Sequence, residues 1–242
     1  MDKKAPANAC LLCGEELEYL KREEQMQCVY CGRTFMSAAR CKNGHYVCDE
    51  CHGKDGNAAI IGYCLHTDSR NPIEIAETLM RHPAVHMHGP EHHVLVGAAL
   101  LAAYCNSGGA GDKKDLLERM ALRGGQVPGG VCGLWGSCGA GISTGIFISL
   151  VTGATPITTE NWGLSNQMTS RSLEAIGKIG GPRCCKRDSF LAICEACRFA
   201  QEKLGVTMEL PERIVCSFIA KNRECLGARC PFSPAYKADD RG

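Results

Sequence analysis

The sequence predicts a mostly α-helical, cysteine-rich protein preceded by a small, metal-binding β-rich module. Cysteines recur in closely spaced pairs up to Cys51, which is typical of a metal-bound ribbon. After Thr67 the chain changes to apolar helical segments separated by glycine and proline, and strand patterns are scarce. We therefore expect a metal module over residues 1–66, an all-α domain over 67–233 and a disordered tail over 234–242.

The composition excludes several classes of protein. A chain of 242 residues, 45% of them hydrophobic, can bury one core and support a small second domain. Its 27 basic and 26 acidic residues are mixed along the chain, so nucleic acid is not an expected partner. No run reaches the roughly 18 apolar residues of a membrane span, and the first residues contain no apolar signal core. We expect a cytoplasmic protein with no membrane partner.

The 18 cysteines are the most unusual feature of the composition, and in a reducing cytoplasm they indicate metal ligation and redox chemistry rather than disulfides. Cys10 and Cys13 form one C-x-x-C pair, and Cys28 and Cys31 form a second pair after a gap of 14 residues. Each pair can turn both sulfurs toward one cation, and two pairs complete a tetrahedral site. We predict a zinc ion held by these four cysteines.

A second set of ligands follows directly in the chain. Cys41, His45, Cys48 and Cys51 have the residue types and spacing of a Cys₃His zinc site. The set resembles half of a treble-clef or RING-type cross-brace, in which the ligand pairs of two ions interleave. The partition of ligands between one or two zinc ions therefore stays open, with His52 as an alternative to His45. We expect the module to be structural glue or a protein-docking surface.

The all-α domain is expected to consist of amphipathic and buried helices. Asn71, Pro72 and Glu74 have the residue types of a helix cap and first turn. The segment that begins at Pro90 is apolar on all sides, which predicts the central buried helix. Later in the chain, Gly141 and Gly145 would allow a second backbone to approach closely. The expected helices run from Pro72 to before Pro83, from Pro90 to about Tyr104, and over 112–123, 139–151, 165–179 and 188–204.

Five of the eight histidines lie in one run, HPAVHMHGPEHH, at the start of the central helix. His92 and His93 fall in its first turn, where the helix dipole disfavours a positive charge. We expect both to be neutral at pH 7, with a lone pair free to bind metal or accept a proton. His86 and His88 would share one face of an extended segment, and Glu91 would orient one ring. The alternative is a hydrogen-bonded loop end without a chemical role.

Cys132 and Cys138 lie in the glycine-rich stretch GGVCGLWGSCGAGISTG. Cys138 precedes the helix expected over 139–151, and a helix N-terminus favours the thiolate form. The glycines leave room for a bulky group beside it, whereas a phosphate-binding loop is disfavoured because the GK[ST] ending is absent. We expect Cys138 to be the most function-critical thiol and Cys132 to be secondary.

Cys184, Cys185, Cys225 and Cys230 are expected to converge with Cys138 around one centre. The alternative is that these cysteines are buried separately in the core, where they behave as small apolar residues. The candidate catalytic residues are Cys138, His92 and His93. The candidate ligands of a cofactor in the domain are Cys132, Cys138, Cys184, Cys185, Cys225, Cys230 and His88.

Four motifs carry a resemblance to a known family. They are HGPEHHVLV (88–96), GGVCGLWGSCGAG (129–141), GPRCCKR (181–187) and NRECLGARCPF (222–232). Together they resemble the domain of unknown function number 5714 over residues 70–233. The stretch around Cys138 is also similar, more loosely, to the redox-active Cys-Gly-Cys-Ala-x-x-Gly proteins, with Cys-Gly-Ala-Gly in place of Gly-Cys-Ala. These resemblances imply a redox or metal-binding function.

Three functions stay open at this point. The first is an iron–sulfur or thiol-based redox protein with a structural zinc module, since four thiolates suffice for a cluster. The second is a Cys/His-dependent metalloenzyme in sulfur or one-carbon transfer, which would pair Cys138 with His92 or His93. The third is a zinc-stapled interaction module without catalysis. The expected cofactors are one or two zinc ions and an iron–sulfur cluster, and the expected partner is a redox or methyltransferase protein.

Overall fold

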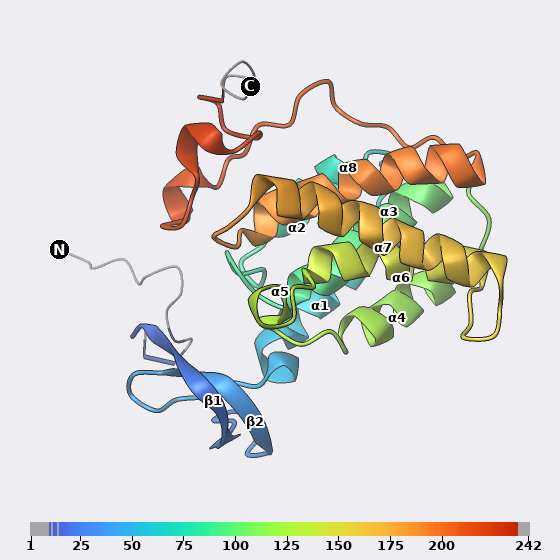
Figure 1. The fold of residues 1–242 in the computed structure, drawn as a ribbon. Coiled ribbons are helices and arrows are strands. Elements are labelled where there is room, and N and C mark those ends of the chain that lie inside the picture. Colours follow the sequence, from blue (N-terminus) through green and yellow to red (C-terminus); the bar gives the residue numbers. More distant parts are fainter. Residues whose placement is uncertain (1–9, 11, 14, 237–242) are drawn as a thin grey trace.

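The computed structural model describes residues 10, 12, 13 and 15–236. The protein is mostly α-helical, with a two-stranded sheet at its N-terminal end, which confirms the fold class expected from the sequence (Figure 1). Of the tail expected over 234–242, residues 234–236 continue a turn in which the Tyr236 N–H donates to the Ser233 carbonyl. Residues 237–242 lie outside the described residues.

The N-terminal sheet is an antiparallel hairpin of β1 (Leu17–Gln27) and β2 (Thr34–Cys41). The register pairs Leu17 with Cys41 at the open end and Gln27 with Thr34 beside the turn. Most side chains of both strands are exposed or half-buried, so the hairpin buries little apolar area. An isolated hairpin is marginally stable in water, so metal bound at the two ends of this one would stabilise it.

Helices form most of the rest of the described chain. They are α1 (Asp49–His66), α2 (Pro72–Met80), α3 (Glu91–Asn106), α4 (Lys113–Gly124), α5 (Val131–Leu134), α6 (Gly139–Thr152), α7 (Glu160–Ile179) and α8 (Cys185–Leu204), followed by the short 3₁₀ helices η1 (Ile219–Lys221) and η2 (Gly227–Arg229). None of the described helices is long and apolar enough to cross a membrane.

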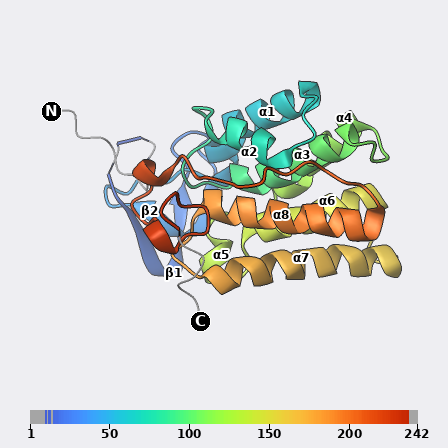
Figure 2. The same cartoon turned by 90° about the horizontal axis from the view of Figure 1, so that it is seen from above.

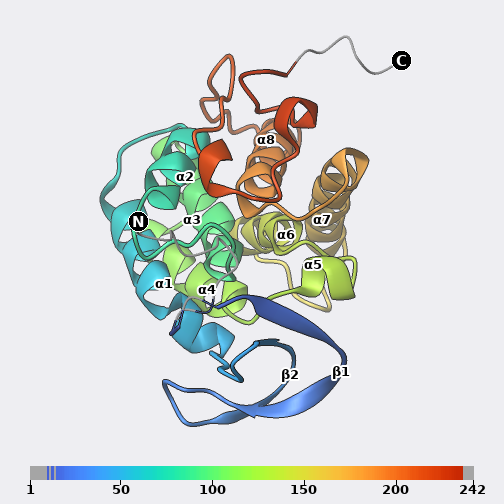
Figure 3. The same ribbon diagram turned by 90° about the vertical axis from the view of Figure 1, so that its left-hand side faces the viewer.

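The helix α3 is the centre of the domain, as its apolar sequence predicts. Every residue from Glu91 to Tyr104 is buried, and α3 packs against α1, α2, α4, α6 and α8. Figures 2 and 3 show α3 enclosed in this way, with α6, α7 and α8 side by side. Each large apolar side chain that α3 buries contributes about 1.5–3 kcal/mol, so this helix organises the core.

The helix α1 is not predicted by the sequence analysis, although its residues fall within the expected metal module. Two glycines in its first half hide the helical pattern, yet Gly53, Gly56, Ile60 and Cys64 form one buried face. A Cβ at Gly56 would lie 2.7 Å from the Ala84 carbonyl oxygen, so only glycine fits there. The helix begins among the metal ligands and packs against α3 and α4. It therefore belongs to both parts of the protein.

Two later helices begin earlier than expected. The helix α7 begins at Glu160 rather than at Ser165. No residue before Met168 is buried in α7, so its first turns have no buried stripe from which the sequence could predict them. The helix α8 begins at Cys185 rather than at Asp188, and the Cys184 side chain caps it by accepting the Arg187 N–H. This shift places Cys184 and Cys185 at a helix N-terminus.

The close approach expected at Gly141 and Gly145 is found between α6 and α7. A Cβ on Gly141 would lie 2.7 Å from Leu173 Cδ2. A Cβ on Gly145 would lie 1.9 Å from Thr169 Oγ1 and 3.0 Å from the Ser165 carbonyl oxygen. The two helices can pack at this distance only because α6 has no side chains at these positions.

The substitution Gly145→Ala is therefore expected to lower the free energy of unfolding by about 1–3 kcal/mol, the cost of overpacking a core. Gly163→Ala is the matched control on α7, where a Cβ meets no atom within 4 Å. The control should be neutral or stabilising, by up to about 1 kcal/mol, because alanine favours helix over glycine. Urea unfolding monitored by circular dichroism measures both variants, and equal effects would contradict the close packing.

Candidate functional site

The N-terminal module brings together two groups of four metal-binding side chains. In each group the ligand atoms lie within 4.8 Å of one another. Sulfur–sulfur distances are 3.7 Å for Cys13–Cys41 and 3.8 Å for Cys31–Cys48. Thiolates bound tetrahedrally at about 2.3 Å from an ion lie about 3.8 Å apart, so both groups have the spacing of a metal site. The first group is Cys10, Cys13, Cys41 and His45, and the second is Cys28, Cys31, Cys48 and Cys51.

This partition corrects the expectation that the two C-x-x-C pairs share one ion. The register of the hairpin explains it, because Leu17 pairs with Cys41 at one end of β1. The first C-x-x-C pair therefore meets Cys41 at that end, whereas Cys28 follows the opposite end. The ligand pairs interleave along the chain, as in a cross-brace. His45 is a member of the first group, with Nδ1 3.3 Å from Cys13 Sγ, and His52 is not its substitute.

One thiol of the first group is suited to bind an ion at neutral pH. A hydrogen bond from the Glu15 backbone, with the nearby His45 and Cys41, lowers the pKa of Cys13 to about 6. A thiolate, rather than a thiol, is the form that binds metal.

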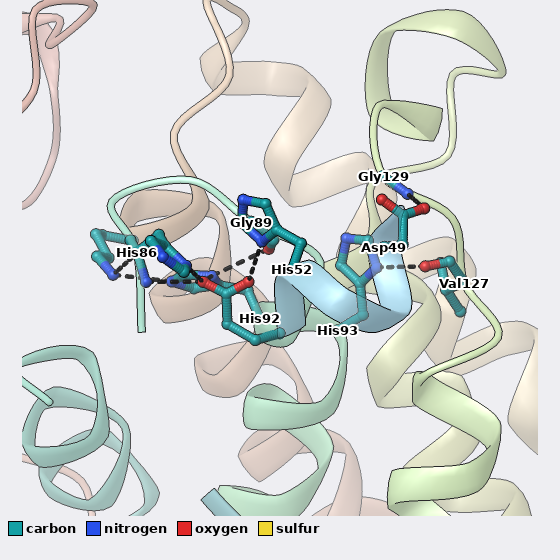
Figure 4. Close-up of polar contacts among 10 residues, drawn as sticks. Asp49, His52, His86, Gly89, His92, His93, Val127 and Gly129 are labelled. Atoms are coloured by element: carbon teal, nitrogen blue, oxygen red, sulfur yellow. Dashed lines mark hydrogen bonds and ion pairs between the residues drawn. The ribbon is translucent and has the colours of Figure 1, made fainter. Parts of the chain in front are cut away.

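The second metal group is joined directly to the helical domain through the start of α1. Cys48 is the N-cap of α1, and Cys51 lies in its first turn. Between them, Asp49 Oδ2 accepts a 2.8 Å hydrogen bond from the Gly129 N–H, at the loop before α5 (Figure 4). An ion in this group would thus hold α1 against the loop that leads to Cys132 and Cys138.

The N-terminal ends of α1, α3, α6 and α8 meet on the side of the domain that faces the module. His52 of α1 lies near Glu91 of α3, and Lys186 of α8 contacts His92 of α3. A Cβ on Gly139, the first residue of α6, would lie 2.3 Å from His93 Nε2. Helix N-termini carry partial positive charge, so this end of the bundle favours carboxylates and neutral imidazoles.

Glu91 is the buried centre of this polar region, with no exposed surface. Its Oε1 accepts a 2.8 Å bond from the His86 backbone N–H and lies 3.3 Å from His86 Nδ1. Its Oε2 lies 3.6 Å from His52 Nδ1. Burial raises the pKa of Glu91, but the imidazoles of His52 and His86 outweigh burial and hold it well below its usual range. Glu91 is therefore a carboxylate.

His92 and Lys186 form the second layer behind Glu91. His92 Nδ1 donates to the Gly89 carbonyl at 3.2 Å, and its Nε2 lies 2.9 Å from Lys186 Nζ. Lys186 Nζ also donates to the His86 carbonyl at 2.8 Å. Burial lowers the pKa of His92 well below its usual value and that of Lys186 to about 8. A neutral His92 that accepts from a largely protonated Lys186 satisfies both groups.

The other two candidate histidines have separate partners. His93 Nδ1 donates to the Val127 carbonyl at 2.8 Å (Figure 4), and burial lowers its pKa. His88 Nε2 lies 3.3 Å from Asn222 Oδ1, and Asn222 Nδ2 donates to Cys184 Sγ at 3.4 Å. Through Asn222, His88 is thus linked to the cysteines rather than to His92 and His93.

Cys138 and Cys184 cap adjacent helices and share one carboxylate. Cys138 is the N-cap of α6, and its Sγ lies 4.0 Å from Asp188 Oδ2. The same oxygen accepts the Cys184 N–H at 3.3 Å, while Arg187 Nε donates to Asp188 Oδ1 at 2.8 Å. Burial is the main cause that raises the pKa of Cys138 to about 12, of Cys184 to about 11 and of Cys185 to about 12.

The body cysteines converge only in part, with Cys138 and Cys184 both in contact with Asp188 Oδ2. Cys184, Cys225 and Cys230 line one cavity of about 10 Å³, together with Cys216, but Cys138 and Cys185 do not. Among residues 15–236, no three of these sulfurs have the mutual spacing of a single-ion site.

Several residues of this region were not singled out from the sequence. His52, His86 and Glu91 form a third group of potential ligands, although each of them was noted in the sequence only for another role. Lys186 and Asp188 were missed, although they directly follow the Cys-Cys pair in a charged run that the structure buries. A run of Lys-Arg-Asp beside two cysteines is the signal that could have indicated them.

The partition of ligands predicts how many ions survive chelation in two double variants. Cys13→Ser with Cys41→Ser leaves the second group intact, so one ion should resist a chelator. Cys13→Ser with Cys28→Ser damages both groups, and no ion should resist. Native mass spectrometry after treatment with EDTA counts the ions, and the reverse result would restore the pairing by C-x-x-C motifs.

The helical domain with its four motifs matches a known family. The sequence model of a family described as a family of unknown function (DUF5714) matches residues 60–233. The match covers more than half of the chain and begins within α1, after both cysteine groups. No curated protein and no solved structure matches the chain. The chain belongs to the DUF5714 family.

Proposed function

We propose that this protein is a zinc-stapled thiol redox protein in which Cys138 is the reactive thiol. The observation that supports this most directly is the 4.0 Å approach of Cys138 Sγ to Asp188 Oδ2. The other oxygen of Asp188 is held by Arg187, which is itself fixed by a 3.0 Å bond to the Pro182 carbonyl. A nucleophile beside a proton acceptor that a third group orients is the common arrangement for activation.

Zinc is the ion proposed for the two cysteine groups. Three thiolates with one imidazole, and four thiolates, are the donor sets that zinc prefers in structural sites. All four coordination positions of each ion would be filled by the protein, so these ions would stabilise the fold and take no part in chemistry. The proposed function of these two ions is to hold α1 and the hairpin together.

Cys185 is proposed as the resolving thiol for Cys138. It begins α8 directly after Cys184, whose N–H donates to the Asp188 oxygen that Cys138 Sγ approaches. Cys132, in the same glycine-rich stretch as Cys138, is the other candidate partner.

The proposed reaction is thiol–disulfide exchange with a disulfide substrate. Cys138 gives its proton to Asp188, and the thiolate attacks one sulfur of the substrate while the other leaves and takes up a proton. Cys185 then attacks the Cys138 sulfur of the mixed disulfide and releases the second substrate thiol. The chain loses two electrons and the substrate gains two, so a redox partner protein has to reduce the pair again.

The titration of Cys138 gives a first test. Its raised pKa, about 12, means that the reactive thiolate increases about tenfold per pH unit across pH 7–10. Asp188 is the proposed proton acceptor of the Cys138 thiol, so Asp188→Asn should slow alkylation of Cys138 at neutral pH, even though loss of the Asp188 charge removes one cause of the raised pKa. Asp115→Asn, on the exposed surface of α4, is the control. Mass spectrometry of the Cys138 peptide follows alkylation, and a plateau below pH 8 in the wild type would contradict this account.

Exchange itself is tested in a single turnover. One mole of reduced protein should convert one mole of a small disulfide to two thiols and gain a Cys138–Cys185 bond, identified by peptide mapping. Cys138→Ser should abolish the conversion of the disulfide. The circular dichroism spectrum and the number of bound ions should stay unchanged in this variant. Cys194→Ser, further along α8, should react as the wild type does. Conversion that survives Cys138→Ser would remove Cys138 from the reaction.

A further inference from the structure

We propose that His52, His86 and Glu91 form a third metal site, which holds one divalent cation with an open coordination position. This site is separate from the two cysteine groups and goes beyond the proposed thiol chemistry. The family domain supplies His86 and Glu91, whereas His52 comes from the first turns of α1, before the family match begins. The N-terminal module would therefore complete a metal centre that the helical domain cannot form alone.

The three side chains have the mutual spacing of metal ligands. Their ligand atoms lie within 4.8 Å of one another. Glu91 Oε1 lies 3.3 Å from His86 Nδ1, and Glu91 Oε2 lies 3.6 Å from His52 Nδ1. Ligands bound tetrahedrally at about 2.0–2.2 Å lie roughly 3.3–3.6 Å apart. The ring centroids of His52 and His86 are 4.5 Å apart and the rings are tilted by 55°, so their Nδ1 atoms can meet at one point beside the Glu91 carboxylate.

Two of the ligand atoms are buried without a hydrogen bond. Within the described part of the chain, neither Glu91 Oε2 nor His52 Nδ1 has a hydrogen-bond partner. A buried carboxylate oxygen that is left unpaired is costly. An ion among the three residues would satisfy both atoms at once, whereas the 3.6 Å distance between them is too long for a hydrogen bond.

The surroundings hold the ligands in place and leave space for them. The His86 backbone N–H donates to Glu91, and the His86 carbonyl accepts from Lys186, so the loop that carries His86 is fixed from both sides. A Cβ on Gly89 would lie 2.1 Å from Glu91 Oε2, so this glycine makes room for the carboxylate. Contacts that orient the ligands in this way are typical of metal sites.

One side of the site faces solvent. The side chains of His52 and His86 are 21% and 32% exposed, whereas Glu91 is fully buried beneath them. Two histidines and one carboxylate leave at least one position for water or a substrate, as in catalytic zinc and non-haem iron sites. The donor set fits Zn²⁺, Fe²⁺, Co²⁺ or Mn²⁺, and the open position points to Lewis-acid or water-activating chemistry at this place.

Titration with Co²⁺ tests the site in the full-length protein after both cysteine groups are loaded with zinc. The wild type should bind one further ion, with visible ligand-field bands and no thiolate-to-cobalt charge-transfer band. His86→Asn and Glu91→Gln should each lower the affinity for this third ion by at least about 100-fold and leave both zinc ions bound. His66→Asn, an exposed histidine at the end of α1, is the matched control and should bind as the wild type does.

Two results would overturn the third site. One is a third ion whose affinity does not change in His86→Asn and Glu91→Gln. The other is the absence of a third ion in wild-type protein, in which case Glu91 forms ion pairs with protonated histidines instead. His86 is partly exposed and has the lower folding risk, so it decides the outcome if Glu91→Gln fails to fold. The thiol reaction of Cys138 should persist in His86→Asn, so failure of one proposal leaves the other standing.

Discussion

The first turns of α1 are the constraint on which the rest of the structure depends. Cys48 and Cys51 place this helix start in the second metal group, and His52 follows in the next position. The same helix buries Gly56, Ile60 and Cys64 against the domain. A metal ion that fixes the start of α1 therefore fixes the position of His52 relative to Glu91 as well. The hairpin buries too little to achieve this by hydrophobic packing.

Around α3, charged side chains of both signs are buried together. Two carboxylates, Glu91 and Asp188, and two cations, Lys186 and Arg187, are almost completely buried. Arg187 pairs directly with Asp188, whereas Lys186 reaches Glu91 only through His86 and His92. Burial of ionic groups costs free energy unless each is paired and hydrogen-bonded. Such an arrangement is more easily explained by chemistry at the site than by stability, because apolar residues would pack here at lower cost.

The sequence predicts the features that depend on local pattern. The cap at Asn71, the apolar helix after Pro90 and the thiol at the start of α6 all follow from residues within a few positions of one another. The features it misses depend on tertiary contact. The interleaved ligands follow from the register of β1 with β2, and the role of His52 follows from the packing of α1 on α3. Neither contact produces a periodic pattern of residues in the sequence.

Hydrogen exchange of the backbone of α1 tests the central claim most directly. Removal of both metal ions by a strong chelator should expose the first turns of α1, from Asp49 to about Gly56, to rapid exchange. The amides of α3 and α8 should stay protected, because their packing does not involve the cysteine groups. If the start of α1 kept its protection after both ions were removed, packing alone would hold it, and the metal-held helix would not be the constraint described here.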